Sequence, residues 1–390
     1  AYFFFKSLKL IHSVFFCLIF FENHQINRIL ALKSPDKCSY SEGSFFKILY
    51  FMFLKIILKL WNENLREKKT CFCEKLGVED MTRTKKTNAP SFTKNYLSKH
   101  PHRLIRNIAT ARQMDKLRNT FIETLKNYVV NGRIHADINQ LRGDQGGTLT
   151  GRLSYSHPNL QQLPNYNEFG TGIRSIFSPN SDEETWGCFD YSQQEPRLVV
   201  HFALRTTGII GIDTMAKSFR EDPSTDFHQI VADIAGIDRK EAKTINLGLF
   251  YGMGVAKLQE QLGINDEEEA KKLIAKYHYK VPFVKQLLYS VMQRAQNSGK
   301  IRTLLGRLCR FPLWEPNQFG IHKALPHDQA LLEHGPGIKR AYTYKALNKL
   351  IQGSAADMTK KSMVELYKEG IVAHIQIHDE LDLSIENEKE

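Results

Sequence analysis

Apolar residues recur at helical spacing in the first part of the chain that shows a clear pattern. Between residues 111 and 131 the apolar positions include Met114, Leu117, Phe121, Leu125 and Tyr128. Because these intervals place side chains on one face of a helix, the pattern predicts an amphipathic helix here. A connection rich in Gly, Asp, Gln and Thr follows at residues 142–151 and is expected to be a loop.

Strict alternation of apolar and polar residues marks the last part of the chain. Between residues 373 and 385 the odd positions are apolar, with the single exception of Asp379. Alternation of this kind is typical of a half-buried strand or hairpin. A tight turn at His378 and Asp379 would explain the exception, because Asp is common in turns. The sharper hypothesis is that Asp379 is a ligand for a hard cation such as Mg²⁺.

A second acid, Asp190, directly follows a short apolar stretch that is predicted to be a strand. A helix is expected next, because Ser192 and Glu195 have the spacing of a capping box and Pro196 would fall in its first turn. Glu195 can be explained as a cap partner alone. Asp190 is harder to explain, since a carboxylate at the end of a buried strand costs free energy unless something pairs with it. Two acids from separate strands could hold two Mg²⁺ ions for an in-line phosphoryl displacement.

Between these acids lies a stretch that is predicted to form a helix with a basic face. Arg239, Lys243, Leu247 and Tyr251 are spaced four residues apart and share one face of that helix. Asp238 precedes the helix and can cap it. Two cations followed by an aliphatic and an aromatic side chain match the phosphates, sugar and base of a nucleoside triphosphate. An amphipathic helix with a solvated basic edge would show the same residues and is commoner.

Length and composition restrict the class of protein. The chain has 390 residues, which suits two or three domains. A hydrophobic fraction of 42% and a charged fraction of 25% exclude wholesale disorder. The net charge of +12 favours a polyanionic partner, which could be nucleic acid, an acidic membrane surface or a phosphorylated ligand. A basic protein without such a partner would have the same composition.

The six cysteines do not form a recognisable framework. No C-x-x-C pair occurs, so a zinc ribbon is not predicted, and six cysteines in a chain of this length indicate a reducing compartment. Two apolar stretches lie near the start, at residues 1–21 and 45–61, and the first could be a signal peptide or a short membrane anchor. The preferred interpretation is an incomplete or mis-started sequence, because the chain begins with Ala and these runs resemble translated AT-rich flanking sequence.

Taken together, the motifs resemble those of family A DNA polymerases, the bacterial and phage DNA polymerase I type. Two further segments add to the resemblance, and all of them occur in the order that the family has. The matching segments are Thr150–Pro164, Asp190–Glu195, Arg239–Gly252, Asn348–Asp357 and His378–Glu380. Five ordered motifs make a chance match very improbable, although each would be weak alone.

The resemblance implies an α+β, right-hand polymerase fold with an antiparallel palm sheet, helical fingers and a partial thumb, incomplete at both ends. Residues 103–150 would form the partial thumb and residues 211–340 the fingers. The palm would be discontinuous, with its first part at residues 151–210 and a truncated second part at residues 341–390. Residues 1–102 would be an uninterpretable or poorly ordered segment.

The resemblance also implies roles for individual residues by position. Two Mg²⁺ ions would be held by Asp190, Asp379 and the carbonyl of Tyr191, and the catalytic residues would be Asp190, Asp379, Lys243 and Glu380. The deoxynucleoside triphosphate would contact Arg239, Lys243, Leu247, Tyr251, Gln193, Glu195 and His228. Primer–template DNA would contact Arg152, Asn159, Gln161, Gln162, Arg307, Asn348, Gln352 and His378.

Some positions depart from the family pattern. Leu247 replaces the commoner Phe or Tyr, Gln194 and Pro196 replace the usual Ile and Leu, and Asp382 lies where an apolar residue is usual. The expected function is template-directed addition of deoxynucleotides to a primer 3′-hydroxyl with release of pyrophosphate. An inactive nucleic-acid-binding remnant and a single-subunit RNA polymerase are the alternatives, and Glu195 argues against the second.

The expected setting follows from the same resemblance. Primer–template DNA and deoxynucleoside triphosphates would be the partners, with no obligate protein partner and no membrane. The cell compartment is expected to be the cytoplasm or nucleoid, or an organelle matrix. No proofreading-exonuclease or 5′-nuclease motif occurs in the sequence.

Overall fold

The structure is a computed structural model that describes residues 92–387, apart from residues 142, 144–145, 165–167, 251–252, 265, 319 and 321. The predictions for residues 1–91, including the membrane anchor, therefore lie outside the described residues. The chain forms two compact units, Ala1–Lys116 and Leu117–Glu390, and each is described by itself. In the part of the chain that the structure describes, no helix combines the length and apolar character needed to cross a bilayer.

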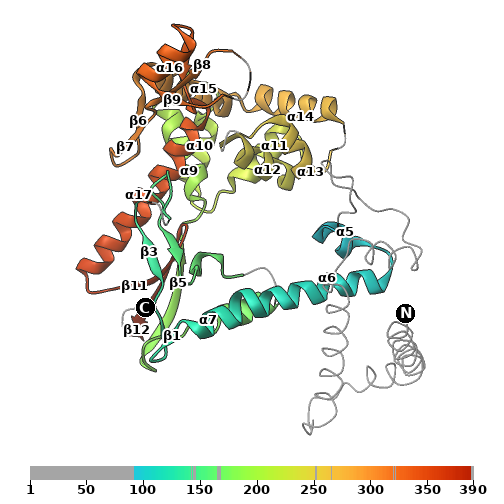
Figure 1. The fold of residues 1–390 in the computed structure, drawn as a ribbon, viewed down its shortest axis with the longest axis vertical. Helices are drawn as coiled ribbons and strands as arrows, with labels where there is room; N and C mark the ends of the chain where they lie inside the picture. The colour runs from blue at the N-terminus through green and yellow to red at the C-terminus, as the bar shows by residue number, and fades with distance from the viewer. Residues whose placement is uncertain are drawn as a thin grey trace. The chain divides into compact units, whose positions relative to one another are not determined.

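The described part of the first unit consists of two helices, α5 at Lys94–Lys99 and α6 at Arg103–Lys116. Thr93 caps α5, because its hydroxyl accepts a hydrogen bond from the backbone N–H of Tyr96 at 3.2 Å. Leu97 of α5 and Ile105 of α6 are fully buried. The helices are drawn in blue-green in Figure 1.

The second unit opens with the rest of the predicted amphipathic helix. Leu117–Ile122 is a π-helical turn, and α7 follows at Glu123–Asn127. Leu117 and Leu125 are buried, as the apolar spacing predicted. The prediction of a helix is therefore confirmed, but the pattern did not indicate the wider turn, which is rare in proteins.

An antiparallel sheet of three strands holds the segments with the two predicted acids. Its strand order is β11 at Ala373–Ile377, β12 at Glu380–Glu386 and β5 at Glu184–Asp190, and the three lie side by side in Figure 1. The predicted hairpin is confirmed as β11 and β12. On the polar face, Gln376 and Asp382 are only 4% and 5% exposed, whereas His378 on the same face is exposed, so this face is buried in part.

A helical layer occupies the middle of the chain and contains an extensive hydrophobic core. The core includes the buried rings of Phe227, Phe250, Tyr277 and Phe283. The helices are α9 at Gln194–Leu204, α10 at Asp213–Glu221, α11 at Phe227–Ala235, α12 at Arg239–Phe250, α13 at Val255–Leu262, α14 at Glu267–Lys280 and α15 at Pro282–Ser298.

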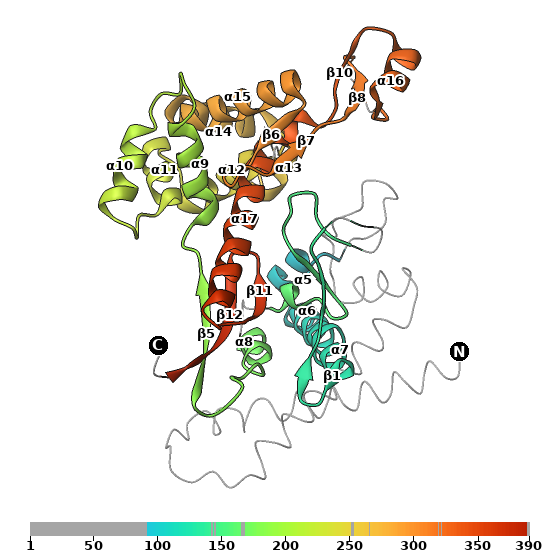
Figure 2. The same cartoon turned by 90° about the vertical axis from the view of Figure 1, so that its left-hand side faces the viewer.

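The long helix α17, at Ala346–Lys368, connects this core with the sheet. Its first half contributes Leu347 and Ile351 to the core and packs against α9 and α15. Its second half reaches β11, and Figure 2 shows it running beside the hairpin. The fold therefore fixes the sheet relative to the helical layer within this unit.

Short elements complete the second unit. The two-stranded pairs are β1 at Val129–Val130 with β2 at Arg133–Ile134, β3 at Asp137–Asn139 with β4 at Ser154–Ser156, and β6 at Lys300–Arg302 with β7 at Leu308–Arg310. A small sheet has the order β10 at Ile338–Arg340, β8 at Leu313–Pro316 and β9 at Leu325–Pro326. The remaining helices are η2 at Leu160–Gln162, α8 at Glu168–Arg174, α16 at His327–His334 and η3 at Thr343–Lys345.

Candidate active site

The sheet brings the two predicted acids together at one end. Asp190 is the last residue of β5 and is paired in register with Glu380, the first residue of β12. Asp379 lies in the tight turn that precedes β12, and its carbonyl accepts a hydrogen bond from the N–H of Tyr191 at 3.3 Å. His378, its neighbour in the turn, has a positive φ of 59°. Asp379 is therefore a turn residue that lies beside the strand end carrying the other acid, and its role as a cation ligand stays a prediction.

Burial and like charge raise the pKa values of these carboxyl groups. The pKa of Asp190 is raised first by burial and then by the charges of Asp379 and Glu380. Burial is also the main cause of the raised pKa of Asp379, against which the positive charge of Arg152 acts. Because clustered carboxylates are relieved by cations and their oxygens are the ligands that Mg²⁺ prefers, the residues present fit a magnesium site.

Glu380 has a cationic partner that the sequence reasoning missed. The Nη1 of Arg174, at the end of α8, lies 3.0 Å from the Oε1 of Glu380. Burial is the largest cause of the raised pKa of Glu380, and the charge of Asp382 adds to it. Arg174 lies outside every motif, so no local signal in the sequence could have indicated this contact across 206 positions.

Glu195 does not act as the predicted cap partner. The N-cap of α9 is Gln193, which has φ 53° and makes no side-chain cap bond. Glu195 is 9% exposed and forms an ion pair with Arg152 instead. The capping-box prediction was wrong because a distant guanidinium competes for the carboxylate. Pro196 does lie in the first turn of α9, as expected.

Gln193 joins the end of the sheet to the start of α11. Its side-chain carbonyl accepts a hydrogen bond from the backbone N–H of Phe227 at 2.8 Å, and its Nε2 donates to the carbonyl of Thr225 at 2.6 Å. The segment after Asp190 is therefore fixed to the N-terminus of α11 by two hydrogen bonds.

The basic helix forms as predicted and is α12. Asp238 and Glu241 cap it reciprocally, because Asp238 Oδ2 accepts from the N–H of Lys240 at 2.8 Å and Glu241 Oε2 accepts from the N–H of Asp238 at 3.2 Å. The cap predicted at Asp238 is thus confirmed. Ala242 and Ile245 are among the residues on the buried face of the helix.

The opposite face of α12 carries the predicted nucleotide-binding side chains. Arg239 and Lys243 are exposed and Leu247 is half-buried, whereas Tyr251 lies outside the described residues. The Nε of Arg239 donates to Asp226 Oδ2 at 2.8 Å. Asp226 in turn caps α11, since its Oδ1 accepts from the N–H of His228 at 2.9 Å. An ion pair therefore connects the starts of α11 and α12.

A buried chain of polar groups orients His228. Tyr277 donates its hydroxyl proton to Asn246 Oδ1, and the Nδ2 of Asn246 lies 3.1 Å from Nδ1 of His228. Because an amide nitrogen only donates, Nδ1 must accept and the ring proton belongs on Nε2. Burial is the main cause that lowers the pKa of His228 to about 4, and the charges of Lys243 and Arg239 lower it further.

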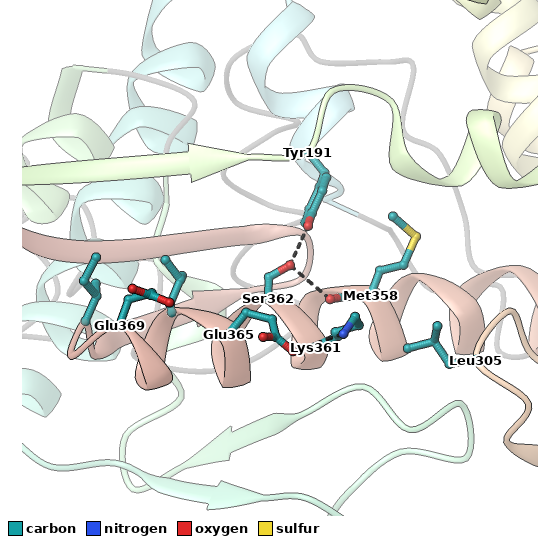
Figure 3. A pocket seen from close by; sticks show the side chains of 9 residues that line it. Tyr191, Leu305, Met358, Lys361, Ser362, Glu365 and Glu369 are labelled. Atoms are coloured by element: carbon teal, nitrogen blue, oxygen red, sulfur yellow. Dashed lines mark hydrogen bonds and ion pairs between the residues drawn. The ribbon is translucent and has the colours of Figure 1, made fainter.

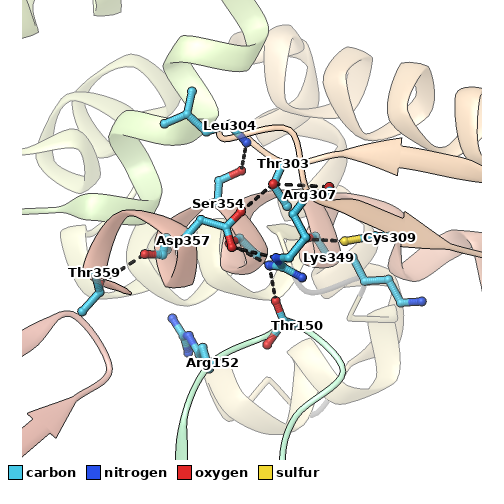
Figure 4. Close-up of polar contacts among 12 residues, drawn as sticks. Thr150, Arg152, Thr303, Leu304, Arg307, Cys309, Lys349, Ser354, Asp357 and Thr359 are labelled. Atoms are coloured by element: carbon cyan, nitrogen blue, oxygen red, sulfur yellow. Dashed lines mark hydrogen bonds and ion pairs between the residues drawn. The ribbon is translucent and has the colours of Figure 1, made fainter. Parts of the chain in front are cut away.

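Three of the predicted DNA-contacting residues have strong partners within the protein, namely Arg152, which pairs with Glu195, and Arg307 and Gln161. Figure 4 shows Arg307 between a loop and α17. Its Nε donates to Asp357 Oδ1 at 2.7 Å, and its Nη2 donates to the carbonyl of Thr150 at 2.6 Å. Gln161 donates its Nε2 to the side chain of Gln376 at 3.1 Å. These bonds position the loops, and contacts with DNA stay a prediction.

The other predicted DNA-contacting residues differ in exposure. Asn159 caps η2, because its Oδ1 accepts from the N–H of Gln161 at 3.1 Å. Those that are exposed or half-buried, and whose contacts with DNA also stay a prediction, are Asn159, Gln162, His378, Asn348 and Gln352.

Tyr191 directs its side chain toward α17 (Figure 3). A pocket of about 520 Å³ lies between Tyr191 and the second half of α17, and Figure 3 shows the ring pointing toward that helix. The hydroxyl of Tyr191 lies 2.5 Å from the Oγ of Ser362. The side chain therefore anchors the strand end to α17, while the main-chain N–H of Tyr191 bonds to the carbonyl of Asp379.

This geometry defines the class of protein, and comparison with known proteins agrees with it. The chain has the α+β fold of a polymerase domain, since it matches "POL domain of Pol1 from M. smegmatis complex with DNA primer-template and dNTP" with a TM-score of 0.61. That match has 28% sequence identity and covers 79% of this chain and 52% of the other. The family model of DNA polymerase family A matches residues 64–390, so the chain belongs to that family.

Individual relatives in this family are similar to the chain in sequence. A DNA-directed DNA polymerase of Pseudomonas phage M6 is 36% identical over 347 residues, which cover 77% of this chain and 49% of the relative. DNA polymerase I of Geobacillus stearothermophilus is 33% identical, over 82% of this chain and 35% of the relative. The chain thus spans about half the length, or less, of these curated relatives. The resemblance inferred from the motifs is confirmed.

Proposed function

We propose that this chain is the polymerase part of a template-directed DNA polymerase, which adds deoxynucleotides to a primer 3′-hydroxyl and releases pyrophosphate. The observation that carries the proposal is the meeting of Asp190 and Asp379 at one end of the sheet. The names of the relatives support the substrates, as do the primer–template DNA and dNTP of the matching mycobacterial complex. In this proposal residues 103–150 form the thumb, 151–210 and 341–390 the palm, and 211–340 the fingers.

A series of contacts connects the acids to the basic helix. Gln193, three residues after Asp190, is bonded to the start of α11, and Asp226 at that start is paired with Arg239 of α12. Because each contact is short, these contacts connect the start of α12 to the strand end, although the ion pair of Asp226 with Arg239 is exposed. A triphosphate bound to the cations of α12 would then have its phosphates positioned beside Asp190 and Asp379, as the proposed reaction requires.

The residues would divide the chemistry among themselves. Two Mg²⁺ ions, held by Asp190, Asp379 and the carbonyl of Tyr191 with Glu380 beside them, would supply activation of the 3′-hydroxyl and neutralisation of the triphosphate. Arg239 and Lys243 would bind the phosphates, and Lys243 would donate a proton to pyrophosphate.

His228 and the buried pair of Glu195 with Arg152 would act on the other parts of the nucleotide. The Nε2–H of His228 would donate to a phosphate oxygen, because Asn246 fixes the neutral tautomer. Glu195 would crowd the sugar C2′ and exclude a 2′-hydroxyl, with Leu247 and Tyr251 beside the sugar and base. Minor-groove acceptors common to all base pairs suit contacts from residues such as Gln162 and His378.

Primer extension by the purified chain tests the proposal. We expect Mg²⁺-dependent extension that falls by at least roughly 10²–10³-fold in Asp190→Asn and in Asp379→Asn, because each change removes a negative charge where cation binding is needed. Asp328→Asn is the matched control, since Asp328 is an exposed acid on α16. Titration with Mn²⁺ should show weaker binding to both site variants. Undiminished extension by Asp379→Asn would overturn the assigned role.

A further inference from the structure

A second group of potential metal ligands lies on the same sheet, beside the candidate active site. Cys188 of β5 is paired in register with Asp382 of β12, and Glu380 lies two residues earlier on β12. Cross-strand partners and alternate residues of a strand point to the same face of a sheet. Accordingly, one thiol sulfur and two carboxylate oxygens lie within 4.8 Å of one another.

Asp382 is the member of this group whose burial calls for a partner. Its residue is only 5% exposed, and its Oδ1 has no hydrogen-bond partner in the described part of the chain. Arg174 is paired with Glu380 at 3.0 Å, and no ion pair with Asp382 is found among the described residues. A buried carboxylate oxygen without a partner costs free energy, which a bound cation would offset.

We propose that Cys188, Glu380 and Asp382 bind one divalent ion of the zinc class, separate from the magnesium ions of the proposed polymerase. Mg²⁺ prefers oxygen ligands alone, whereas Zn²⁺ accepts both thiolate and carboxylate. Three protein ligands leave a fourth position of a tetrahedral site for water. Binding would release the thiol proton to solvent, because the ligand is the thiolate. Exposure of Cys188 at the sheet surface gives the ion a route in.

Cobalt binding tests the site without any nucleic acid or nucleotide. Co²⁺ substitutes for Zn²⁺ and reports a thiolate ligand through charge-transfer absorption. The full chain is titrated with Co²⁺ in excess Mg²⁺, which occupies oxygen-only sites, and Zn²⁺ is then added as competitor. We expect Cys188→Ser to lose one equivalent of the thiolate signal. Asp382→Asn should bind Zn²⁺ at least roughly tenfold more weakly. Loss of a residue that only hydrogen-bonds a metal ligand already weakens binding by about 10–100-fold, and Asp382 is proposed to be a ligand itself. Cys309→Ser, at a buried cysteine on β7, should keep the signal.

A melting experiment covers the case in which a variant folds poorly. At one fixed Zn²⁺ concentration the melting temperature should rise in the unmodified chain and in Cys309→Ser, and should rise less in Asp382→Asn, because a ligand of the native state stabilises the fold in proportion to its affinity. The proposal is overturned if Cys188→Ser and Asp382→Asn both bind like the unmodified chain. It is also overturned if the signal is lost in Asp379→Asn but retained in Cys188→Ser, since the ion would then belong to the catalytic acids.

Discussion

The imidazole of His228 shows how a buried polar chain can set the charge of one residue. Asn246 donates to Nδ1, and the residue is 7% exposed, so the neutral ring is favoured. The pKa of His228 is lowered to about 4 from its ordinary value of 6.5. Because the unfolded chain takes up the proton near pH 6.5 and the folded chain only near pH 4, this contribution to stability is complete above the first value and is lost as the pH falls toward the second.

We therefore expect His228→Gln to lose less stability than the unmodified chain when the pH is lowered from about 7 to about 4.5. Urea unfolding at a series of pH values measures the difference. His327→Gln is the matched control, because His327 is exposed on α16 and makes no contact with this chain of groups. Parallel pH profiles for His228→Gln and the unmodified chain would show that burial of His228 does not control this dependence.

Glu195 offers a prediction about selectivity. The carboxylate is buried against Arg152, so it is held rigidly at the start of α9. If it excludes the 2′-hydroxyl, Glu195→Ala should raise the use of ribonucleotides relative to deoxynucleotides by roughly 10–200-fold, the range that small differences of shape provide. Glu195→Gln keeps the size and should change the ratio little. Competitive incorporation assays measure the ratio, and a preference for ribonucleotides in the unmodified chain would favour an RNA polymerase.

At the scale of elements, Arg307 holds three parts of the chain together. Its guanidinium binds Asp357 and the carbonyl of Gly353 on α17 as well as the carbonyl of Thr150 in a loop. Gly353 leaves room for this approach, because a Cβ at that position would lie 3.0 Å from Arg307 Nη2 and from Thr303 Cγ2, which is tighter than an ordinary contact. A glycine in the middle of a helix is otherwise unfavourable, so close packing explains its presence.

Gly353→Ala should consequently destabilise the protein by about 1–3 kcal/mol, even though Ala is the better helix former. Gly172→Ala in α8 is the control, because nothing lies within 4 Å of its added Cβ and a gain of about 0.5–1 kcal/mol is expected. Urea unfolding of both variants measures the free energies. A more stable Gly353→Ala would mean that the guanidinium moves aside at little cost.

Elements with strong local patterns could be predicted from the sequence, whereas their long-range partners could not. The hairpin before and after Asp379 and the helix beginning at Arg239 follow from periodicity and capping residues. The partners of Glu195 and Glu380 come from segments 43 and 206 positions away. Charge pairing across such distances leaves no trace in a local pattern, so the capping box was a reasonable but wrong inference.

The net charge of the whole molecule predicts how DNA affinity depends on salt, and this prediction is independent of catalysis. Exposed cations such as Lys243 add to the net charge of +12, and phosphate contacts release counterions from DNA. If 6–10 phosphates are neutralised, affinity for primer–template DNA should fall by roughly 10³–10⁵-fold between 50 and 200 mM salt. Fluorescence anisotropy measures this dependence, and an affinity that does not change with salt would exclude an electrostatic interface.

The same measurement separates a polymerase from a remnant that only binds nucleic acid. Asp379→Asn removes one acid without touching the basic face of α12, so its DNA affinity should have the same salt slope while its primer extension is lost. An unmodified chain that binds DNA with this slope and never extends a primer would favour the remnant. Because the acids lie on the sheet and the cations on a helix, binding and chemistry depend on different elements, and a loss of one leaves the other measurable.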